Sequence, residues 1–161
     1  MLQAEYRGVQ EMAETNTIRV PRPICFGEHR RRGFAVFEHL EFCRGGSEYE
    51  LGQQLARMHR HTAEQFGLSF DNTIGVTHQP NAWRDSWPGL WEEMRLNHML
   101  RLTNNVGFDD KKIEALRTKT RELLDHDPVP SLVHGDLWGG NKGYCLEDGK
   151  RVPVIFDPAT Y

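Results

Sequence analysis

The spacing of apolar residues at the N-terminus predicts a first helix. The apolar positions recur at steps of four, three and four residues, at Leu2, Tyr6, Val9 and Ala13. This spacing places the side chains on one face of a helix. We therefore expect a helix that turns this stripe toward a core.

Two short strands are expected next. The prolines of the segment 21–23 force an extended backbone and exclude helix there. Apolar runs over 23–27 and 33–40 have the length of strands, and the basic run 29–32 between them has the place of a hairpin tip. Four consecutive basic residues can bind anions, although a solvated turn is the simpler interpretation.

A second helix is predicted to begin at Ser47, just after the glycine pair 45–46, where we place a lobe boundary. Ser47 has the place of an N-cap, and Glu50 three residues later completes a capping box. The apolar stripe of this helix consists of Leu51, Leu55 and Met58. His59 and His61 follow on the same helix but face different ways, so we do not expect a metal pair.

A polar loop and a tryptophan-rich helix come next. Residues 70–81 are rich in turn formers and amides, and long polar loops often carry binding groups. The tryptophans after this loop recur at steps of four residues, at Trp83, Trp87 and Trp91. We expect them to form a core stripe rather than a ligand cage, on a helix that continues to Leu102.

A further helix is expected from the acidic pair 109–110, whose charges suit a helix N-terminus, to the stop at Pro128. Its inward face would consist of Ile113, Leu116, Thr120, Leu123 and Leu124. The complete order is then helix, two strands, several helices and two strands, which is an α+β pattern.

Composition and charge narrow the class of protein. The 161 residues are 38% hydrophobic and 27% charged, as in one ordinary globular domain. The net charge of −3 argues against a nucleic-acid partner, and no apolar run approaches the roughly 20 residues of a membrane-spanning helix. The N-terminus does not resemble a secretory signal, and three widely spaced cysteines form no disulfide framework, so we expect a cytoplasmic protein. The oligomeric state does not follow from the sequence.

The chemistry-bearing residues surround a predicted hairpin near the C-terminus. Runs over 142–146 and 151–156 read as strands, and the Asp-Gly pair 148–149 is a strong hairpin signal. Asn141 lies 7.5 positions before the centre of this turn, and Asp157 lies 8.5 positions after it. Antiparallel pairing therefore returns both residues to one end of the hairpin.

Asp136 lies five residues before Asn141, on the loop that enters the hairpin. Two carboxylates and an amide oxygen would thus meet, a set that suits Mg²⁺ holding phosphate oxygens. Phosphoryl transfer needs metal against the phosphates and a carboxylate that orients the attacking hydroxyl and accepts its proton. Asp136 fits this catalytic base, and Asn141 and Asp157 fit the metal ligands. The alternative, in which Asp136 and Asn141 only cap turns, does not explain the ordered set.

The two ends of the chain suggest a piece of a longer protein. A helical pattern begins at Leu2, and the buried strand 154–156 ends only five residues before Tyr161. Natural domains seldom begin inside one element and stop just past another.

Several stretches resemble the fructosamine/ketosamine-3-kinase family, which belongs to the small-molecule branch of the protein-kinase-like fold with aminoglycoside phosphotransferases and choline kinases. The stretches are HGDLWGGN (134–141), VIFDPA (154–159), LGQQLARMH (51–59), DNTIG (71–75) and THQPNAW (77–83). The resemblance implies a partial fold: residues 1–42 as the remnant of a nucleotide-binding N-lobe with one helix, two strands and a hinge, and residues 43–161 as an incomplete helical C-lobe.

The resemblance also implies roles and a reaction. Glu5 would pair with the ATP-binding lysine, and the hinge Glu38-His39-Leu40 would meet adenine through its backbone. Trp138 and His134 would lie near the acceptor sugar. With ATP and Mg²⁺ as cofactors, the enzyme would phosphorylate the sugar 3-hydroxyl of a ketosamine, on a small amine or a protein lysine. Such a kinase serves deglycation because its product is unstable.

The chain also departs from the family. It has no Gly-rich phosphate loop and no lysine before Glu5, so we expect weak or absent ATP turnover by these residues alone. Another small-molecule kinase, of aminoglycoside or choline type, is an alternative. A non-catalytic remnant that binds a nucleotide, a glycated ligand or a partner is a second. A metal hydrolase built on His59, His61 and His134 is the weakest alternative, because their spacing is unlike that of ligands.

Overall fold

The computed structural model describes residues 1–104 and 107–161, and its elements follow the predicted order except for one additional hairpin, β3–β4. In order they are α1 (Leu2–Glu14), β1 (Pro23–His29), β2 (Arg32–Phe37), α2 (Glu48–Met58), β3 (Asn72–Ile74), β4 (Thr77–Gln79), α3 (Trp87–Leu90), the π-helical η1 (Trp91–Leu96), α4 (Asn97–Leu102), α5 (Asp110–Leu124), β5 (Lys142–Glu147) and β6 (Lys150–Ile155). Within the described ranges the strands form three separate two-stranded antiparallel hairpins. None of the described helices has the length and apolar character that crossing a membrane requires.

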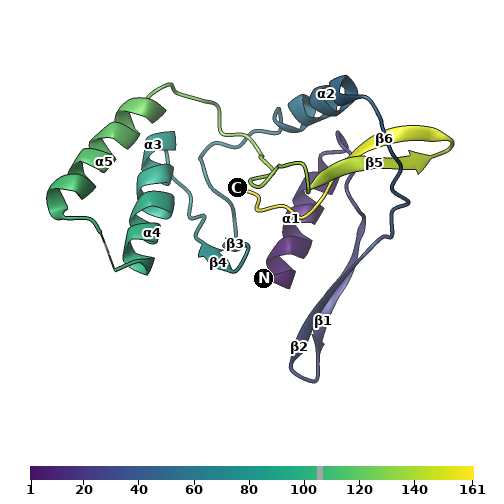
Figure 1. Ribbon diagram of the computed structural model, residues 1–161, viewed down its shortest axis with the longest axis horizontal. Helices are drawn as coiled ribbons and strands as arrows, with labels where there is room; N and C mark the ends of the chain where they lie inside the picture. The colour runs from purple at the N-terminus through teal and green to yellow at the C-terminus, as the bar shows by residue number, and fades with distance from the viewer. Residues whose placement is uncertain (105–106) are drawn as a thin grey trace.

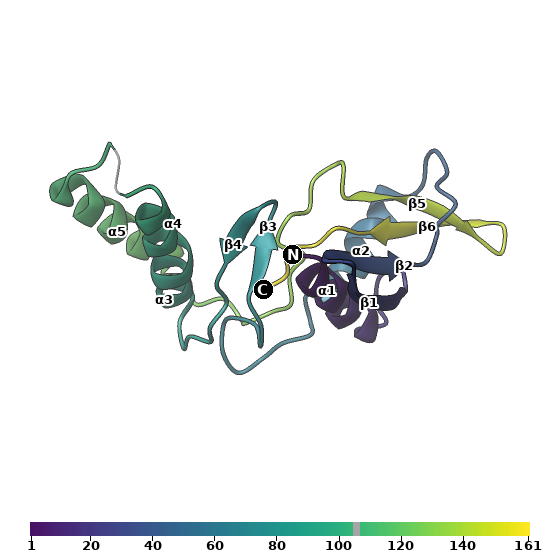
Figure 2. The ribbon, with the colours of Figure 1, turned by 90° about the horizontal axis from the view of Figure 1, so that it is seen from below.

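The elements form two groups that meet at the chain ends (Figure 1). One group contains α1, α2 and the hairpins β1–β2 and β5–β6, while α3, η1 and α4 lie beside α5 in the other. The small hairpin β3–β4 lies between the groups, and Figure 2 shows it next to both chain ends. The candidate chemistry therefore lies where the two groups join.

The main hydrophobic core lies between α1, α2 and β6. Its buried members are Val9, Met12, Ile18, Val20, Leu51, Met58 and Ile155. The apolar stripe predicted for α1 faces this core through Val9, and Tyr6 packs its ring 4.9 Å from the ring of Phe26 on β1. α1 is therefore fixed between the core and the first hairpin.

The start of α2 was predicted correctly, but its end was not. The Ser47 hydroxyl accepts a hydrogen bond from the Glu50 N–H at 3.1 Å, as an N-cap does. The Glu50 carboxylate accepts from Gln54 in the next turn, so among the described contacts the capping box is half formed. The helix ends at Met58, so His59 is the C-cap and His61 lies beyond the helix.

Two helical predictions were too long. Trp83 lies before the helix, next to Arg84, which forms an isolated bridge with Phe66, and the helix begins at Trp87 after the Ser86 cap. α5 ends at Leu124, and of its predicted inward face Ile113 is buried while the others are more open. Leu123, for example, is 67% exposed. The amphipathic pattern of α5 is therefore only partly matched by packing partners.

The predicted hairpins are present with small shifts. β1 and β2 turn through Arg30 and Arg31, both with positive φ, and β2 ends at Phe37 rather than at residue 40. In the second hairpin Glu147 pairs with Lys150, and Asp148 and Gly149 have φ of 49° and 75°, the left-handed pair of a tight two-residue turn. The β3–β4 hairpin inside the polar loop was not predicted.

Candidate active site

Asn141 connects the other two candidate site residues, and we call Asp136, Asn141 and Asp157 the junction. β5 and β6 pair so that Asn141 and Phe156 stand opposite each other just beyond the ladder, and the Phe156 N–H donates to the Asn141 carbonyl. The side-chain Nδ2 of Asn141 donates to the Asp136 carbonyl at 2.9 Å, the Asp136 Oδ2 at 3.3 Å and the Asp157 carbonyl at 3.2 Å. The structure thus brings Asp136, Asn141 and Asp157 together, as the counting of positions predicts.

This arrangement leaves oxygen atoms for a cation. Asn141 is buried and its amide nitrogen is fully occupied, whereas its Oδ1 accepts no hydrogen bond from the described residues. The described ranges contain no group of three His, Cys, Asp or Glu side chains that could hold a metal ion. A metal bound here would therefore need the Asn141 oxygen beside the two carboxylates, an all-oxygen set that fits Mg²⁺.

His134 is an internal support of the loop. It is 2% exposed, its Nδ1 accepts from the Asp136 N–H at 3.3 Å, and its Nε2 donates to the Phe156 carbonyl at 3.0 Å. Burial is the main cause that lowers the pKa of His134, which favours the neutral ring that these two bonds require. With both nitrogens occupied, the ring has no polar atom left for the acceptor contact expected from the sequence.

Gly135 lets the loop lie directly against the segment after Asp157. Its φ is +80°, and a Cβ there would lie 1.9 Å from the Ala159 carbonyl oxygen. The Ala159 N–H donates to the His134 carbonyl at 2.9 Å, and the Val133 N–H donates to the Tyr161 carbonyl at 3.3 Å. A side chain at position 135 would push these two segments apart.

Glu5 faces the site from α1. Burial, and then the nearby charge of Asp157, raises the pKa of the Glu5 carboxyl. Within the described part of the chain Glu5 forms no ion pair, so the basic partner that the resemblance implies has no counterpart there. The carboxylates of Glu5 and Asp157 therefore repel each other across this edge of the site.

The expected hinge, residues 38–40, is fixed mainly by the side chains of Glu38 and Leu40. The Glu38 carboxylate pairs with Arg19 at 2.8 Å and accepts from the Arg22 N–H at 3.0 Å. Leu40 packs in a small buried cluster with Cys145 and Val154. No main-chain hydrogen bond within the described ranges involves residues 39–40, which leaves this stretch of backbone open to a ligand.

Trp138 is the exposed aromatic side chain of the loop. It is 64% exposed, and its ring covers Gly140, where a Cβ would lie 2.3 Å from the ring. The Trp138 carbonyl accepts from the Asn141 N–H at 3.0 Å, which closes the turn. A flat aromatic surface is thus fixed beside the Asn141 junction.

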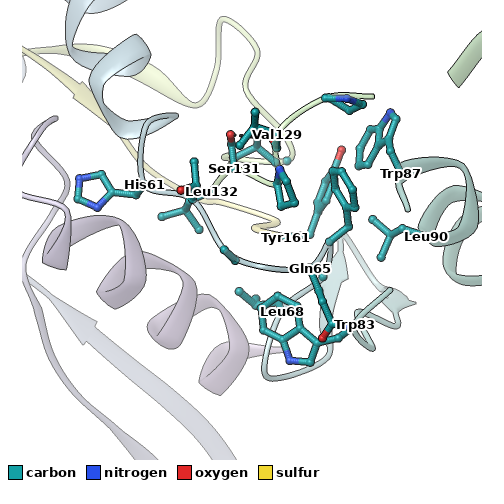
Figure 3. Close-up of a pocket in the computed structure, with 18 of the residues that line it drawn as sticks. His61, Gln65, Leu68, Trp83, Trp87, Leu90, Val129, Ser131, Leu132 and Tyr161 are labelled. Carbon is teal, nitrogen blue, oxygen red and sulfur yellow. Dashed lines mark hydrogen bonds between the residues drawn. The ribbon is translucent and has the colours of Figure 1, made fainter. Parts of the chain in front are cut away.

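A cavity of about 570 Å³ lies on the other side of the loop (Figure 3). Gly135 belongs to its lining, but Asp136, Asn141 and Asp157 do not. Trp83 and Trp87 line it, so two of the three tryptophans expected to form a core stripe border an open space instead. The Tyr161 ring stacks on Trp87 with centroids 6.2 Å apart.

Sequence reasoning missed the buried amides of the β3–β4 hairpin. Asn72, Gln79 and Asn81 were part of a loop expected to carry binding groups, but all three are buried. Asn72 accepts from the side chains of Gln79 and Asn81, and Asn72 and Gln79 donate to the carbonyls of residues 159–160. The signal that could have found them is the run of amides between short apolar stretches.

The fold is shared with solved kinase structures. The crystal structure of a protein named as a fructosamine-3-kinase from Haemophilus somnus matches with a TM-score of 0.84 at 28% identity, covering 99% of this chain and 54% of that one. A second, from Thermobifida fusca and named in the same way, gives 0.73 at 28% identity, with 99% and 55% covered.

The family model described as fructosamine kinase matches residues 1–161, and the chain belongs to the fructosamine kinase family. A "Probable ketoamine kinase" of Synechocystis sp. is 47% identical over 165 residues, covering 100% of this chain and 55% of the relative. "Protein-ribulosamine 3-kinase, chloroplastic" of Arabidopsis thaliana is 39% identical over 171 residues, covering 100% and 51%. The resemblance inferred from the motifs is confirmed, and the chain spans about half the length of the curated relatives it matches.

Proposed function

We propose that this chain carries the catalytic loop and metal-binding hairpin of an ATP-dependent kinase that phosphorylates the sugar 3-hydroxyl of ketosamines and so serves deglycation. The observation that carries this proposal is the junction at Asn141, where the amide binds both Asp136 and Asp157, two residues after the end of β6. The names of the relatives, ketoamine kinase and ribulosamine 3-kinase, support the acceptor class.

In this proposal residues 1–42 are part of a nucleotide-binding lobe and residues 43–161 are part of a catalytic lobe. The irregular stretch between β2 and α2, which includes the hinge, joins the two. Backbone groups of residues 39–40 would meet adenine, and Glu5 would pair with a lysine that holds the nucleotide phosphates. The free cysteines, Cys25, Cys43 and Cys145, support a reducing, cytoplasmic location.

Each side chain of the junction has a separate task. Asn141 Oδ1 and the Asp157 carboxylate would hold Mg²⁺, which supplies positive charge against the phosphates when bound. The Asp136 carboxylate orients the acceptor hydroxyl and accepts its proton. Its Oδ2 shares the Asn141 amide, so the other carboxylate oxygen is the one directed at the acceptor. Trp138 offers its flat face to the C–H groups of the sugar.

The proposal predicts nucleotide binding that depends on the metal. Calorimetric titration of the chain with ATP in Mg²⁺ and in EDTA should show at least tenfold tighter binding with the metal. This difference should disappear in Asp157→Asn. Equal binding with and without metal in the folded wild-type chain would overturn the proposal.

The acceptor is tested by transfer of labelled phosphate from ATP to a panel of alcohols. We expect any transfer to favour a fructosamine over an aminoglycoside or choline. Transfer to an aminoglycoside with none to a ketosamine would reject the acceptor class. Turnover at rates normal for a kinase would show that these residues alone complete the ATP site.

A further inference from the structure

Three buried amide side chains, Asn72, Gln79 and Asn81, form what we call the amide cluster. They come from the β3–β4 hairpin and the residue pair after it, and they are 4%, 6% and 0% exposed. None of them touches Asp136, Asn141 or Asp157 directly among the described hydrogen bonds. They form a second layer behind the candidate active site.

The amide cluster holds the segment after Asp157 by its carbonyl groups. Asn72 Nδ2 donates to the Thr160 carbonyl at 2.6 Å, and Gln79 Nε2 donates to the Ala159 carbonyl at 3.2 Å. Because β6 ends at Ile155, these carbonyls have no strand partner. Buried carbonyls need donors, and the two amides supply them.

The amides also fix one another. Asn72 Oδ1 accepts from Gln79 Nε2 at 2.9 Å and from Asn81 Nδ2 at 3.0 Å. Asn81 Oδ1 in turn accepts from Arg95 at 2.7 Å. Asn72 and Asn81 both donate and accept, and Gln79 donates two bonds, so Gln79 cannot rotate without breaking both of them.

The catalytic loop holds the same segment from the opposite side. The His134 carbonyl accepts from the Ala159 N–H, and the Ala159 oxygen lies against Gly135, the residue before Asp136. The chain from Ala159 to Tyr161 is therefore clamped between the loop that carries Asp136 and the amide cluster.

We propose that Asn72 and Gln79 are positioning residues that set Asp157 relative to Asp136 through the main chain of residues 159–160. This inference rests on the proposed function, since it concerns the same metal site. In this inference the polar loop 70–81 positions the main chain of the site, whereas its composition suggests contact with a ligand.

The test compares two changes at Gln79 with a change on the surface. Gln79→Glu keeps the shape but turns an oxygen toward the Ala159 carbonyl and the Asn72 oxygen, while Gln79→Met removes the donor without adding a charge. Gln53→Glu is the matched control, because Gln53 is exposed on α2 and bonds only to Tyr49 among the described contacts.

The test measures two affinities separately. Electron paramagnetic resonance follows the binding of Mn²⁺ with ATP present, and calorimetry follows the binding of ATP without metal. We expect both Gln79 variants to weaken Mn²⁺ binding at least tenfold and to leave metal-free ATP binding within twofold. Gln53→Glu should change neither. An equal loss of both, or Mn²⁺ affinity within twofold of wild type, would overturn the inference.

Hydrogen exchange of the metal-free chain supplies an independent readout. In Gln79→Met the amides of residues 159–161 should exchange at least tenfold faster, while those of α2 keep their rates. If both Gln79 variants unfold where the control is folded, the cluster is a folding requirement and the inference is wrong. If Mn²⁺ binding by wild type is unaffected by Asp157→Asn, the proposed function fails instead.

Discussion

The side-chain nitrogen of Asn141 lies 3.3 Å from the carboxylate Oδ2 of Asp136, five residues earlier in the chain. The same nitrogen binds the Asp157 carbonyl, so one amide connects the loop before β5 to the segment after β6. The orientation of this amide is fixed because all its neighbours here are acceptors. Its oxygen must therefore point away from them and accepts no hydrogen bond from the described residues.

The first prediction concerns this amide. Asn141→Asp replaces the donor with an oxygen facing the Asp136 carboxylate and two carbonyls. We expect a loss of about 2–3 kcal/mol in the free energy of unfolding, since buried acceptors lose their donor. Urea denaturation measures it, with Gln53→Glu as the exposed amide control. Unchanged stability would mean that the junction does not form in solution.

The second prediction distinguishes the energetic cost of a positive φ from the cost of a steric clash at Gly135. Gly135→Ala must tolerate both a positive φ and a Cβ placed 1.9 Å from the Ala159 oxygen. Gly75→Ala has a positive φ, +56°, but open space around it. We expect the control to lose about 1 kcal/mol and Gly135→Ala to lose clearly more, about 3 kcal/mol or above. Equal losses in urea denaturation would contradict the close approach.

The third prediction concerns Gly8, where α1 touches the segment after Asp157. A Cβ at Gly8 would lie 2.8 Å from the buried Thr160 hydroxyl and 3.4 Å from Pro158. Alanine in an exposed helix interior stabilises by about 0.5–1 kcal/mol, which we expect for Gly52→Ala on α2, where nothing lies near. Gly8→Ala should show no gain or a loss of thermal stability. A gain equal to that of Gly52→Ala would show that α1 is not docked there.

The fourth prediction uses the repulsion between Glu5 and Asp157. Because burial and the Asp157 charge raise the pKa of Glu5 in the folded chain, the ionised form costs stability once the pH exceeds its usual value. Glu5→Gln should therefore stabilise the metal-free chain at pH 7 by a few tenths of a kcal/mol, the range for partly exposed charges. The gain should shrink when Asp157→Asn is already present, and a double-mutant cycle measures this coupling. Additive effects would place the two carboxylates too far apart to interact.

The fifth prediction is a pH dependence. Burial lowers the pKa of His134 in the folded chain, so the unfolded chain binds the proton first as the pH falls. The contribution of the neutral ring is complete above about pH 6.5, the usual unfolded value, and is lost as the pH falls below it. Burial lowers the pKa of His59 too, and this acts in the same direction.

Urea denaturation between pH 5 and 8 separates the two histidines. His134→Asn should be less stable at pH 8 and should show a flatter decline toward pH 5 than wild type. His59→Asn serves as the comparison, because it removes a titrating ring that is not part of the loop. An unchanged slope in His134→Asn would mean that folding does not lower the pKa of this ring.

Local patterns were sufficient for the second hairpin and for the junction at its end. The Asp-Gly turn fixes the centre of the hairpin, and a ladder of fixed spacing then carries Asn141 and Asp157 to the same end. The start of α2 could also be predicted from the sequence, because the N-cap side chain accepts a hydrogen bond from an N–H only three residues away. The family followed from the same short motifs.

The sequence by itself thus determined the β1–β2 and β5–β6 hairpins, most helix starts and the residues gathered around Asn141. The tertiary structure alone decided that the amides of residues 72–81 turn inward, that His134 is buried and that Trp83 borders a cavity. The reason is physical: turn and cap preferences act over a few residues, whereas Asn72 finds its partner at Thr160, 88 residues away. Which polar side chain is buried depends on such distant donors and acceptors.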